Sequence, residues 1–292
     1  MRPSFFLLRH VQGSRAISST APNVPVLMYH HVCPSGQLAV TPDNFARQIR
    51  WLARHGWRSL SGQDFAAYMA GEPMPPKSVV LTFDDGYLDN WVYAHPVLQQ
   101  YGMTALLFLV TGWVGDGVAR PHAGSSPGSA LPATPDHAAC KQAVAAQACD
   151  EVILRWSEIQ AMQAAGSFEI HSHTHTHSRW DQQCATPAEK TERLQQDLER
   201  SRTALQQNLG GVSDHLCWPQ GYFDDDYLGV AALAGFRHLY TTDARGQNLP
   251  GADTRHIYRV AAKNKGGPMF AQRLWLARHP YWGPLYNAWK KR

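Results

Sequence analysis

Segments typical of strands and segments typical of helices alternate along most of this chain. Short apolar runs such as Ser78–Leu81 and Thr104–Val110 are separated by stretches whose apolar residues recur at helical spacing. No internal repeat and no linker interrupts this alternation. Such an order of elements folds around a parallel sheet with helices packed on it. We therefore predict a single α/β domain, for which 292 residues are enough to bury a substantial core.

The boundaries of the elements follow from turn and cap residues. Thr41 is a typical N-cap with proline at the first helical position, and Ser157 is expected to cap a helix that ends at Gly166. Pro96 is expected to kink its helix. The expected strands are 24–32, 78–81, 104–110, 168–170, 215–218, 236–242 and 256–262, and the expected helices are 42–55, 62–69, 90–101, 157–165, 187–209, 225–234 and 269–279.

Two adjacent carboxylates, Asp84 and Asp85, follow the first long apolar strand and precede Gly86. Ligands bind at the carboxyl ends of strands in parallel α/β sheets and barrels. Two like charges this close raise each other's pKa unless a cation or a hydrogen-bond donor holds one of them ionised. A metal ion on one aspartate would leave the other free to act as a base. A solvated pair of turn residues is the alternative.

A second polar cluster follows the short strand Phe168–Ile170, where histidines alternate from His171 to His177. A turn in this run would bring His173 and His177 together. Two imidazoles and one carboxylate form a set that suits zinc and leaves a position for water. The same set suits iron, cobalt or nickel, so it does not fix the metal. A solvated loop or an adventitious metal binder is the alternative.

These two segments, Thr82–Tyr87 and Glu169–His177, resemble the first two motifs of the polysaccharide deacetylases, the NodB-homology enzymes of carbohydrate esterase family 4. The resemblance covers about residues 25–260. It implies a distorted (β/α)7-type barrel in a single domain. It also implies that Asp84 is the general base and that Asp85, His173 and His177 hold a divalent metal ion, zinc first and cobalt, nickel or iron as alternatives.

The third motif of the family, Arg-x-Pro-x-Gly, is matched only in part by Cys217–Gly221, since no arginine precedes the proline. In the family this arginine orients the base. Asp243 resembles the aspartate of the fourth motif and is expected to orient the acid. The residues expected to contact the substrate or its oxyanion are Tyr87, Trp218, Pro219, Gln220, Gly221 and Tyr222.

The late Leu-x-His segment that usually carries the proton donor is missing from the C-terminal part of this chain. The first strand, by contrast, ends in His30 and His31, and this start resembles the circularly permuted deacetylases of poly-N-acetylglucosamine. A barrel can begin its strand order at another point and still place the same residues around one site. We therefore predict that His30 is the donor, with His31 as the second choice. Structural roles for both histidines are the alternative.

The activity that the resemblance implies is the metal-assisted removal of N-acetyl groups from an amino-sugar glycan, with release of acetate. Hydrolysis of another non-peptide C–N amide bond and a non-catalytic glycan-binding descendant are the alternatives. The expected partner is therefore an acetylated glycan. The formal net charge of +4 is small for this length and does not indicate a nucleic-acid partner.

The two ends of the chain lie outside the expected barrel. Residues 1–22 are interpreted as a flexible tail, because the apolar run Phe5–Leu8 is shorter than the about 7–15 residues of a secretory signal. Residues 263–292 are interpreted as a helix and an aromatic, basic tail, which packs on the domain or touches a membrane surface or an anionic glycan. No run is long enough for a membrane span. These features favour the cytoplasm, and the periplasm or cell envelope stays open.

The deacetylase domain, residues 23–262, contains an irregular insertion at 115–150, which is rich in Ala, Pro, Ser and Gly. A stretch of this length is either a substrate lid or a tolerated insertion, and 138–148 could form a short helix within it. Five scattered cysteines argue against a full disulfide framework. Cys140 and Cys149 could pair, but free thiols are the preferred interpretation.

Overall fold

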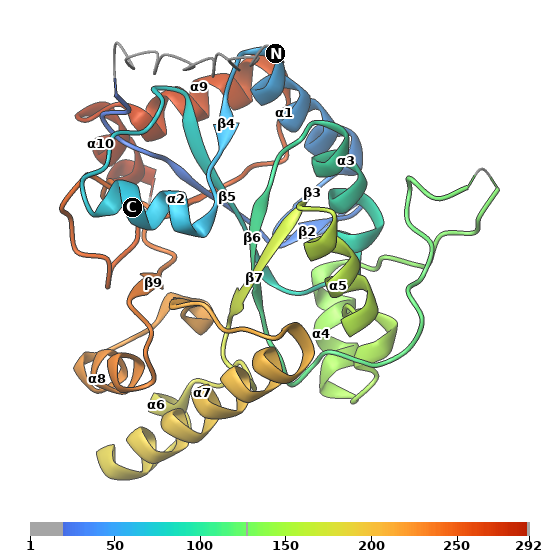
Figure 1. The fold of residues 1–292 in the computed structure, drawn as a ribbon, viewed down its shortest axis with the longest axis vertical. Helices are drawn as coiled ribbons and strands as arrows, with labels where there is room; N and C mark the ends of the chain where they lie inside the picture. Colours follow the sequence, from blue (N-terminus) through green and yellow to red (C-terminus); the bar gives the residue numbers. More distant parts are fainter. Residues whose placement is uncertain (1–19, 127, 291–292) are drawn as a thin grey trace, which may run out of the picture.

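The computed structural model in Figure 1 describes residues 20–126 and 128–290. Within these ranges seven parallel strands form a curled sheet in the order β10-β1-β5-β6-β7-β8-β9. A single parallel bridge between Tyr240 and Ile257 links the two ends of this sheet. The distorted barrel predicted from the sequence is therefore confirmed. The seven strands are β1 Val26–Tyr29, β5 Ser78–Asp85, β6 Ala105–Leu109, β7 Phe168–Ser172, β8 His215–Cys217, β9 His238–Tyr240 and β10 Val260–Ala261.

Three short strands complete the β-structure of the described residues. β2 (His31–Val32) pairs with β3 (Ala39–Val40), and β4 (Arg58–Ser59) pairs with β5. The helices surround the sheet: Figure 1 shows α1, α3 and α5 along one side, α9 and α10 at the top and α7 at the bottom. Their bounds are α1 Pro42–Arg54, α2 Gly62–Met69, α3 His95–Gln100, α4 His137–Ala145, α5 Trp156–Ala164, α6 Trp180–Gln183, α7 Pro187–Leu209, α8 Asp225–Leu233, α9 Gly267–Arg278 and α10 Trp282–Lys290.

The central strand β5 is buried on both faces, as parallel strands covered by helices usually are. Val79, Leu81 and Phe83 pack in the larger hydrophobic cluster, while Val80 packs in a second cluster with residues of β6, β8 and β9. Side chains alternate along a strand. Asp84 therefore continues the face of Val80.

Most of the expected helices are present, and the cap residues explain their starts. Thr41 caps α1 by accepting a hydrogen bond from the Asn44 N–H, and α7 ends at Gly210 in the left-handed conformation. The kink expected at Pro96 corresponds to a π-helical turn, Asn90–Ala94, that runs into α3.

Two local predictions are wrong. The cap position of α5 is Arg155, while the Ser157 hydroxyl donates to the Gly117 carbonyl instead. The expected strand 256–262 is reduced to β10, Val260–Ala261. Tertiary contacts override the local pattern in both places.

The insertion 115–150 contains α4, close to the helix expected at 138–148, and Figure 1 draws the stretch before it as a long loop. Arg120 ties this loop to the body of the protein through two hydrogen bonds to the Glu158 carboxylate, of 2.7 and 2.8 Å. Cys140 and Cys149 are free, as are the other three cysteines. The preferred interpretation of free thiols is therefore confirmed.

The C-terminal helices extend the fold beyond the sheet. α9 packs against the core through Phe270 and Leu274. On α10, by contrast, Trp282, Leu285 and Trp289 are largely exposed, although they line a shallow pocket together with Trp275 and Leu276 of α9. None of the helices in residues 20–126 and 128–290 combines the length and hydrophobicity that a bilayer crossing requires. The tail expected at residues 1–22 lies almost wholly outside the described residues.

Candidate active site

The register of the parallel strands brings the two polar motifs together. Asp85 on β5 is paired with Leu109 on β6, and Leu109 is paired with Ser172 on β7. The chain continues from Ser172 into His173, whose N–H donates to the Leu109 carbonyl over 2.9 Å. The carboxylate and the first histidine therefore leave neighbouring strands at the same edge of the sheet.

Asp85, His173 and His177 form one cluster. The His173 Nε2 and His177 Nε2 atoms lie 3.3 and 3.5 Å from Asp85 Oδ1, and the two imidazole planes cross at 66°. Among the described residues this buried oxygen has no hydrogen-bond partner. His173 Nδ1 lies 2.7 Å from the Cys217 carbonyl, so it carries a proton and leaves Nε2 as a lone-pair donor. The donor set and its orphaned oxygen fit a divalent cation.

Two of the three side chains in the cluster are in the ionisation state that a metal ion needs. Burial alone would raise the pKa of Asp85, but its contact with His173 and the charge of His177 lower it, and the net shift is downward. Burial lowers the pKa of His177 to about 4, which keeps this imidazole neutral around pH 7. An ionised carboxylate beside a neutral imidazole is the state that binds a metal ion. Burial would lower the pKa of the third, His173, but its contacts with Cys217 and Asp85 raise it above the ordinary value, so a metal ion would have to displace a proton there.

The backbone of the ligand loop is held in an uncommon conformation. Asp85, Thr174 and His177 have φ of +75°, +65° and +60°, although none is glycine. Such conformations persist only where the surroundings enforce them. Asp197 on α7 does so for the loop, because its buried carboxylate accepts hydrogen bonds from the N–H groups of His175 and Thr176.

Other groups of side chains in the described residues fit a metal ion less well. Asp214, His215 and His238 also lie close together, but the two rings are stacked within 17° of parallel. Two imidazoles stacked face to face cannot both direct an in-plane lone pair at one ion. In a further group His31 is already bonded to Asp89 over 2.6 Å. In the remaining group, Asp84, His173 and Cys217, both oxygens of Asp84 already accept from Arg259. Among these groups, Asp85, His173 and His177 therefore fit a metal ion best.

Asp84 lies beside this cluster. Its carboxylate is held by Arg259, the residue just before β10. Arg259 Nη1 and Nη2 donate to the two carboxylate oxygens over 2.7 and 2.8 Å, and both side chains are almost completely buried. Burial would raise the pKa of Asp84, but the charge and hydrogen bonds of Arg259 outweigh it and lower the pKa. Asp84 is therefore ionised and fixed in orientation.

The two consecutive histidines after β1 take different positions. His30 lines the pocket, with Nε2 3.7 Å from Asp84 Oδ2. His31 is fully buried, and its Nδ1 lies 2.6 Å from Asp89 Oδ2. The carboxylate beside His30 is thus Asp84, whereas Asp243, which was expected to orient the acid, forms ion pairs with Arg245 and His256.

A pocket of about 550 Å³ opens over these groups. Trp113, Leu38 and residues of α4 contribute to its walls together with the predicted site residues. The full lining is Met28, His30, Leu38, Asp84, Asp85, Tyr87, Trp113, His137, Lys141, Val144, Ala145, His173, His177, Trp218, Gln220 and Thr242. The insertion 115–150 therefore forms part of the site through α4.

The residues of the partial third motif divide between the pocket and the core. Trp218 reaches the pocket, but it is fully buried in a cluster with Leu194 and Tyr227. Gln220 lines the pocket, while the N–H of Gly221 donates to the Trp218 carbonyl.

Pro219 and Tyr222 lie at the two ends of this turn. Pro219 is buried at the start of the turn. The Tyr222 ring lies under the Arg179 guanidinium, 3.9 Å from it, and is not among the residues that line the pocket.

Sequence reasoning missed Arg259, Trp113 and His137. An arginine inside the apolar segment Ile257–Ala262 was a signal for Arg259, because an unpaired charge is too costly to bury. Trp113 follows the strand β6 closely, at its carboxyl end. No local signal pointed to His137.

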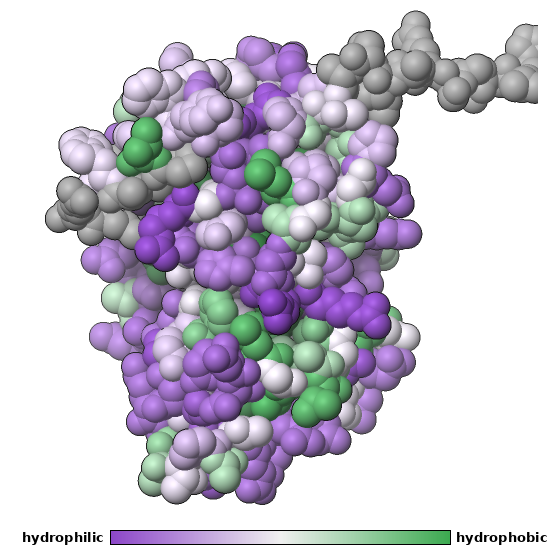
Figure 2. Space-filling model, turned by 90° about the vertical axis from the view of Figure 1, so that its left-hand side faces the viewer, coloured by the Kyte–Doolittle hydropathy of each residue, from purple (hydrophilic) through white to green (hydrophobic). Residues whose placement is uncertain are grey.

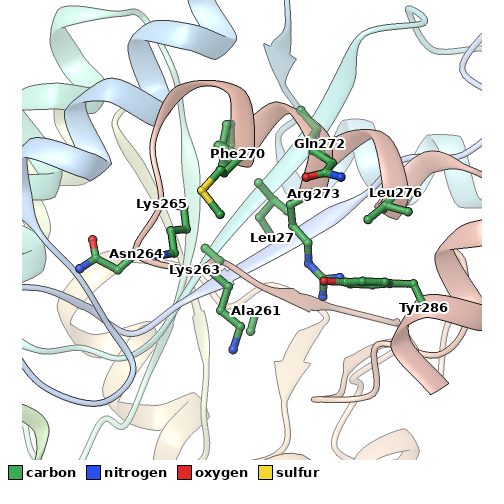
Figure 3. Close-up of a pocket in the computed structure, with 13 residues that line it drawn as sticks. Leu27, Ala261, Lys263, Asn264, Lys265, Phe270, Gln272, Arg273, Leu276 and Tyr286 are labelled. Atoms are coloured by element: carbon green, nitrogen blue, oxygen red, sulfur yellow. The ribbon is translucent and has the colours of Figure 1, made fainter. Parts of the chain in front are cut away.

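A second pocket, of about 490 Å³, lies between β10 and α9 (Figure 3). Lys263, Lys265 and Arg273 border it, and the Tyr286 ring lies next to the Arg273 guanidinium. None of the predicted site residues lines this pocket.

Figure 2 shows a neighbouring side of the molecule, where the surface is mostly hydrophilic and hydrophobic residues gather in the lower half.

The fold and the site together define a parallel α/β barrel with an aspartate pair and a histidine pair at the carboxyl ends of adjoining strands. The family model described as polysaccharide deacetylase matches residues 71–239, more than half of the chain. The chain therefore belongs to the polysaccharide deacetylase family.

Similar proteins agree with this assignment. YxkH of Bacillus subtilis (strain 168) is 36% identical over 93 residues, which are 32% of this chain and only 33% of YxkH. The poly-beta-1,6-N-acetyl-D-glucosamine N-deacetylase of Staphylococcus aureus (strain MRSA252) is 24% identical over 226 residues, 76% of this chain and 67% of the relative. The structure of IcaB from Ammonifex degensii matches with a TM-score of 0.67 at 24% identity, over 89% of this chain and 99% of that one. This last likeness concerns the fold.

Proposed function

We propose that this protein is a metal-dependent hydrolase that removes N-acetyl groups from a glycan containing N-acetylglucosamine and releases acetate. The observation that carries the proposal is that Asp84, held ionised by Arg259, shares one pocket with the cluster of Asp85, His173 and His177. The name of the staphylococcal relative supports a β-1,6-linked substrate.

The cluster would hold the metal ion, with zinc as the first choice and cobalt, nickel or iron as alternatives. A divalent ion in such a site lowers the pKa of bound water and polarises the carbonyl group of the acetamide. The Cys217 carbonyl orients His173 for this role, and Asp197 holds the loop that carries His177.

Asp84 and His30 would move the protons. Asp84 takes a proton from the attacking water, and the C–N bond of the acetamide breaks as acetate forms. His30 then donates a proton to the departing amine. The distance of 3.7 Å between His30 Nε2 and Asp84 Oδ2 supports these roles, since both side chains line the same pocket. Histidine is the side chain most often used as a general acid or base in enzymes.

The test is acetate release from β-1,6-linked and β-1,4-linked N-acetylglucosamine oligomers by the zinc-loaded protein. Asp84→Asn is the matched control, because it keeps the shape of the side chain and the metal cluster but removes the base. It should retain zinc and lose about 10²–10⁴ in kcat. Absence of acetate from every oligomer would refute the proposal, and loss of zinc in Asp84→Asn would reverse the roles of the two aspartates.

A further inference from the structure

A chain of three polar side chains runs from the interior of the protein to the pocket. It begins at Asp89, which follows β5, passes through His31 in β2 and ends at His137, the first residue of α4. His31 Nδ1 lies 2.6 Å from Asp89 Oδ2, and His31 Nε2 lies 3.2 Å from His137 Nδ1. His137 lines the pocket beside Asp85 and Tyr87.

Asp89, at the buried end of this row of three side chains, determines which atoms carry the protons. The second Asp89 oxygen, Oδ1, accepts hydrogen bonds from the Val32 N–H and the Asn90 side chain, of 3.0 and 2.7 Å. Two donors on a buried carboxylate favour its ionised form. Ionised Asp89 can only accept, so the proton between it and His31 belongs to His31 Nδ1.

The tautomer of His31 in turn determines the direction of its hydrogen bond to His137. In the tautomer with its proton on Nδ1, His31 offers a lone pair at Nε2, which can accept from the Nδ1–H of His137. The Tyr87 hydroxyl, 3.5 Å from the same Nδ1, is a weaker neighbour. His137 Nε2 is then left as a hydrogen-bond acceptor.

We propose that His137 is a substrate-binding residue whose Nε2 accepts a hydrogen bond from a hydroxyl group of the bound sugar, with Asp89 and His31 as positioning residues that set its tautomer. The proposal rests on the function proposed above. It gives the insertion a role in recognition: His137 is a directional polar group at the pocket, to which α4 also contributes Lys141 and the apolar residues Val144 and Ala145. One hydrogen bond of this kind corresponds to about 3- to 10-fold in affinity.

Two amide substitutions separate this role from a purely structural one. His137→Asn keeps a polar atom near the position of Nδ1, facing His31, and removes the one at Nε2. His137→Gln does the reverse. With a β-1,6-linked N-acetylglucosamine pentamer and zinc-loaded protein, His137→Ala and His137→Asn should raise KM about 3- to 10-fold, with a smaller change in kcat. His137→Gln should show the lower KM of the two amides.

The opposite order, with KM for His137→Asn equal to or below that for His137→Gln, would mean that His137 only anchors α4 and would overturn the proposal. An unchanged KM in His137→Ala would also overturn it. Zinc content and melting temperature of each variant show that site and fold are intact. Failure of the proposed function is a different result, since the unmodified protein would then release no acetate.

Asp89→Asn tests the positioning role. An asparagine can keep Oδ1 on the Val32 N–H while its amide donates to His31 Nδ1, which reverses both tautomers and turns His137 Nε2 into a donor. KM should rise in this variant but not further when Asp89→Asn is added to His137→Ala, because coupled residues are not additive. Equal effects of Asp89→Asn in both backgrounds would overturn the positioning role.

Discussion

Replacing Arg259 with methionine removes the only cation that contacts both oxygens of Asp84 in the described structure. Methionine fills similar space but leaves the carboxylate buried without its partner. Arg259 also donates to the Thr241 carbonyl and the Thr82 hydroxyl, over 2.8 and 3.1 Å. The substitution therefore leaves several buried acceptors with one donor fewer.

The expected cost is large because both partners are buried. Breaking a buried ion pair by removing one member costs about 3–5 kcal/mol. For a protein of this size about 1 kcal/mol shifts the melting temperature by about 2–4 °C. Arg259→Met should thus lower the melting temperature by on the order of 10 °C at pH 7.5.

The cost should also depend on pH. Arg259 lowers the pKa of Asp84 below its ordinary value, so the pair stabilises the unmodified fold above that value and loses this effect as pH falls through the lowered pKa. Without the arginine, burial raises the pKa of Asp84, and stability then falls as pH rises through the raised value. The difference in the free energy of unfolding should therefore grow from pH 4.5 to pH 7.5.

Chemical denaturation of both proteins at these two pH values measures the difference, and acetate release measures the loss of the oriented base. Arg255→Met is the matched control, since Arg255 pairs with Asp253 on the surface only four residues away. Exposed pairs contribute little to stability. A cost of Arg259→Met no larger than that of Arg255→Met, or one that is equal at both pH values, would refute the reasoning.

Three further predictions concern the site. His173→Ala and His177→Ala should each lose stoichiometric metal by elemental analysis, whereas His171→Ala and His175→Ala should keep it; retention in the first pair would exclude the cluster as the metal site. His30→Ala should keep metal and fold but lower kcat by about 10² or more in the acetate assay, and wild-type kcat would remove it as the donor. Gly221→Ala should lower the melting temperature, because φ is +72° and a Cβ atom would lie 2.8 Å from the Thr242 nitrogen; Gly211→Ala, with open space around it, is the control, and equal melting temperatures would contradict the argument.

The sequence predicts those parts of the site whose positions depend on residues nearby in the chain. Asp84 and Asp85 end a strand, and His173 and His177 follow the end of another, so each motif is placed by its own element. The carboxyl ends of parallel strands lie at one edge of a sheet, which is enough to bring the motifs together.

Arg259 could not be placed in the same way. Its contact with Asp84 spans 175 residues and depends on which strands lie side by side, since β10 pairs with β1 and β1 with β5. The family pattern directed attention to the positions before Pro219, where Cys217 and Trp218 stand, whereas the guanidinium that contacts Asp84 belongs to the residue before β10.

His137 and Trp218 show two other limits of prediction from the sequence. The position of His137 depends on how α4 docks against β2, and composition alone predicted only an irregular segment with a short helix. Trp218 was predicted to contact the substrate; it lines the pocket, but its side chain is also fully buried against core residues, as hydrophobicity favours for a tryptophan. Its role in binding stays a prediction.

The long span between Asp84 and Arg259 has a consequence for the order in which the site matures during synthesis. The proposed metal ligands all precede residue 178, so a nascent chain could complete that cluster while β10 is still inside the ribosome. Until β10 docks beside β1, the carboxylate of Asp84 has no guanidinium to hold it ionised in a buried position. A growing polypeptide should thus acquire its affinity for metal before its hydrolytic activity. Docking of the last parallel strand would be the step that completes the active site.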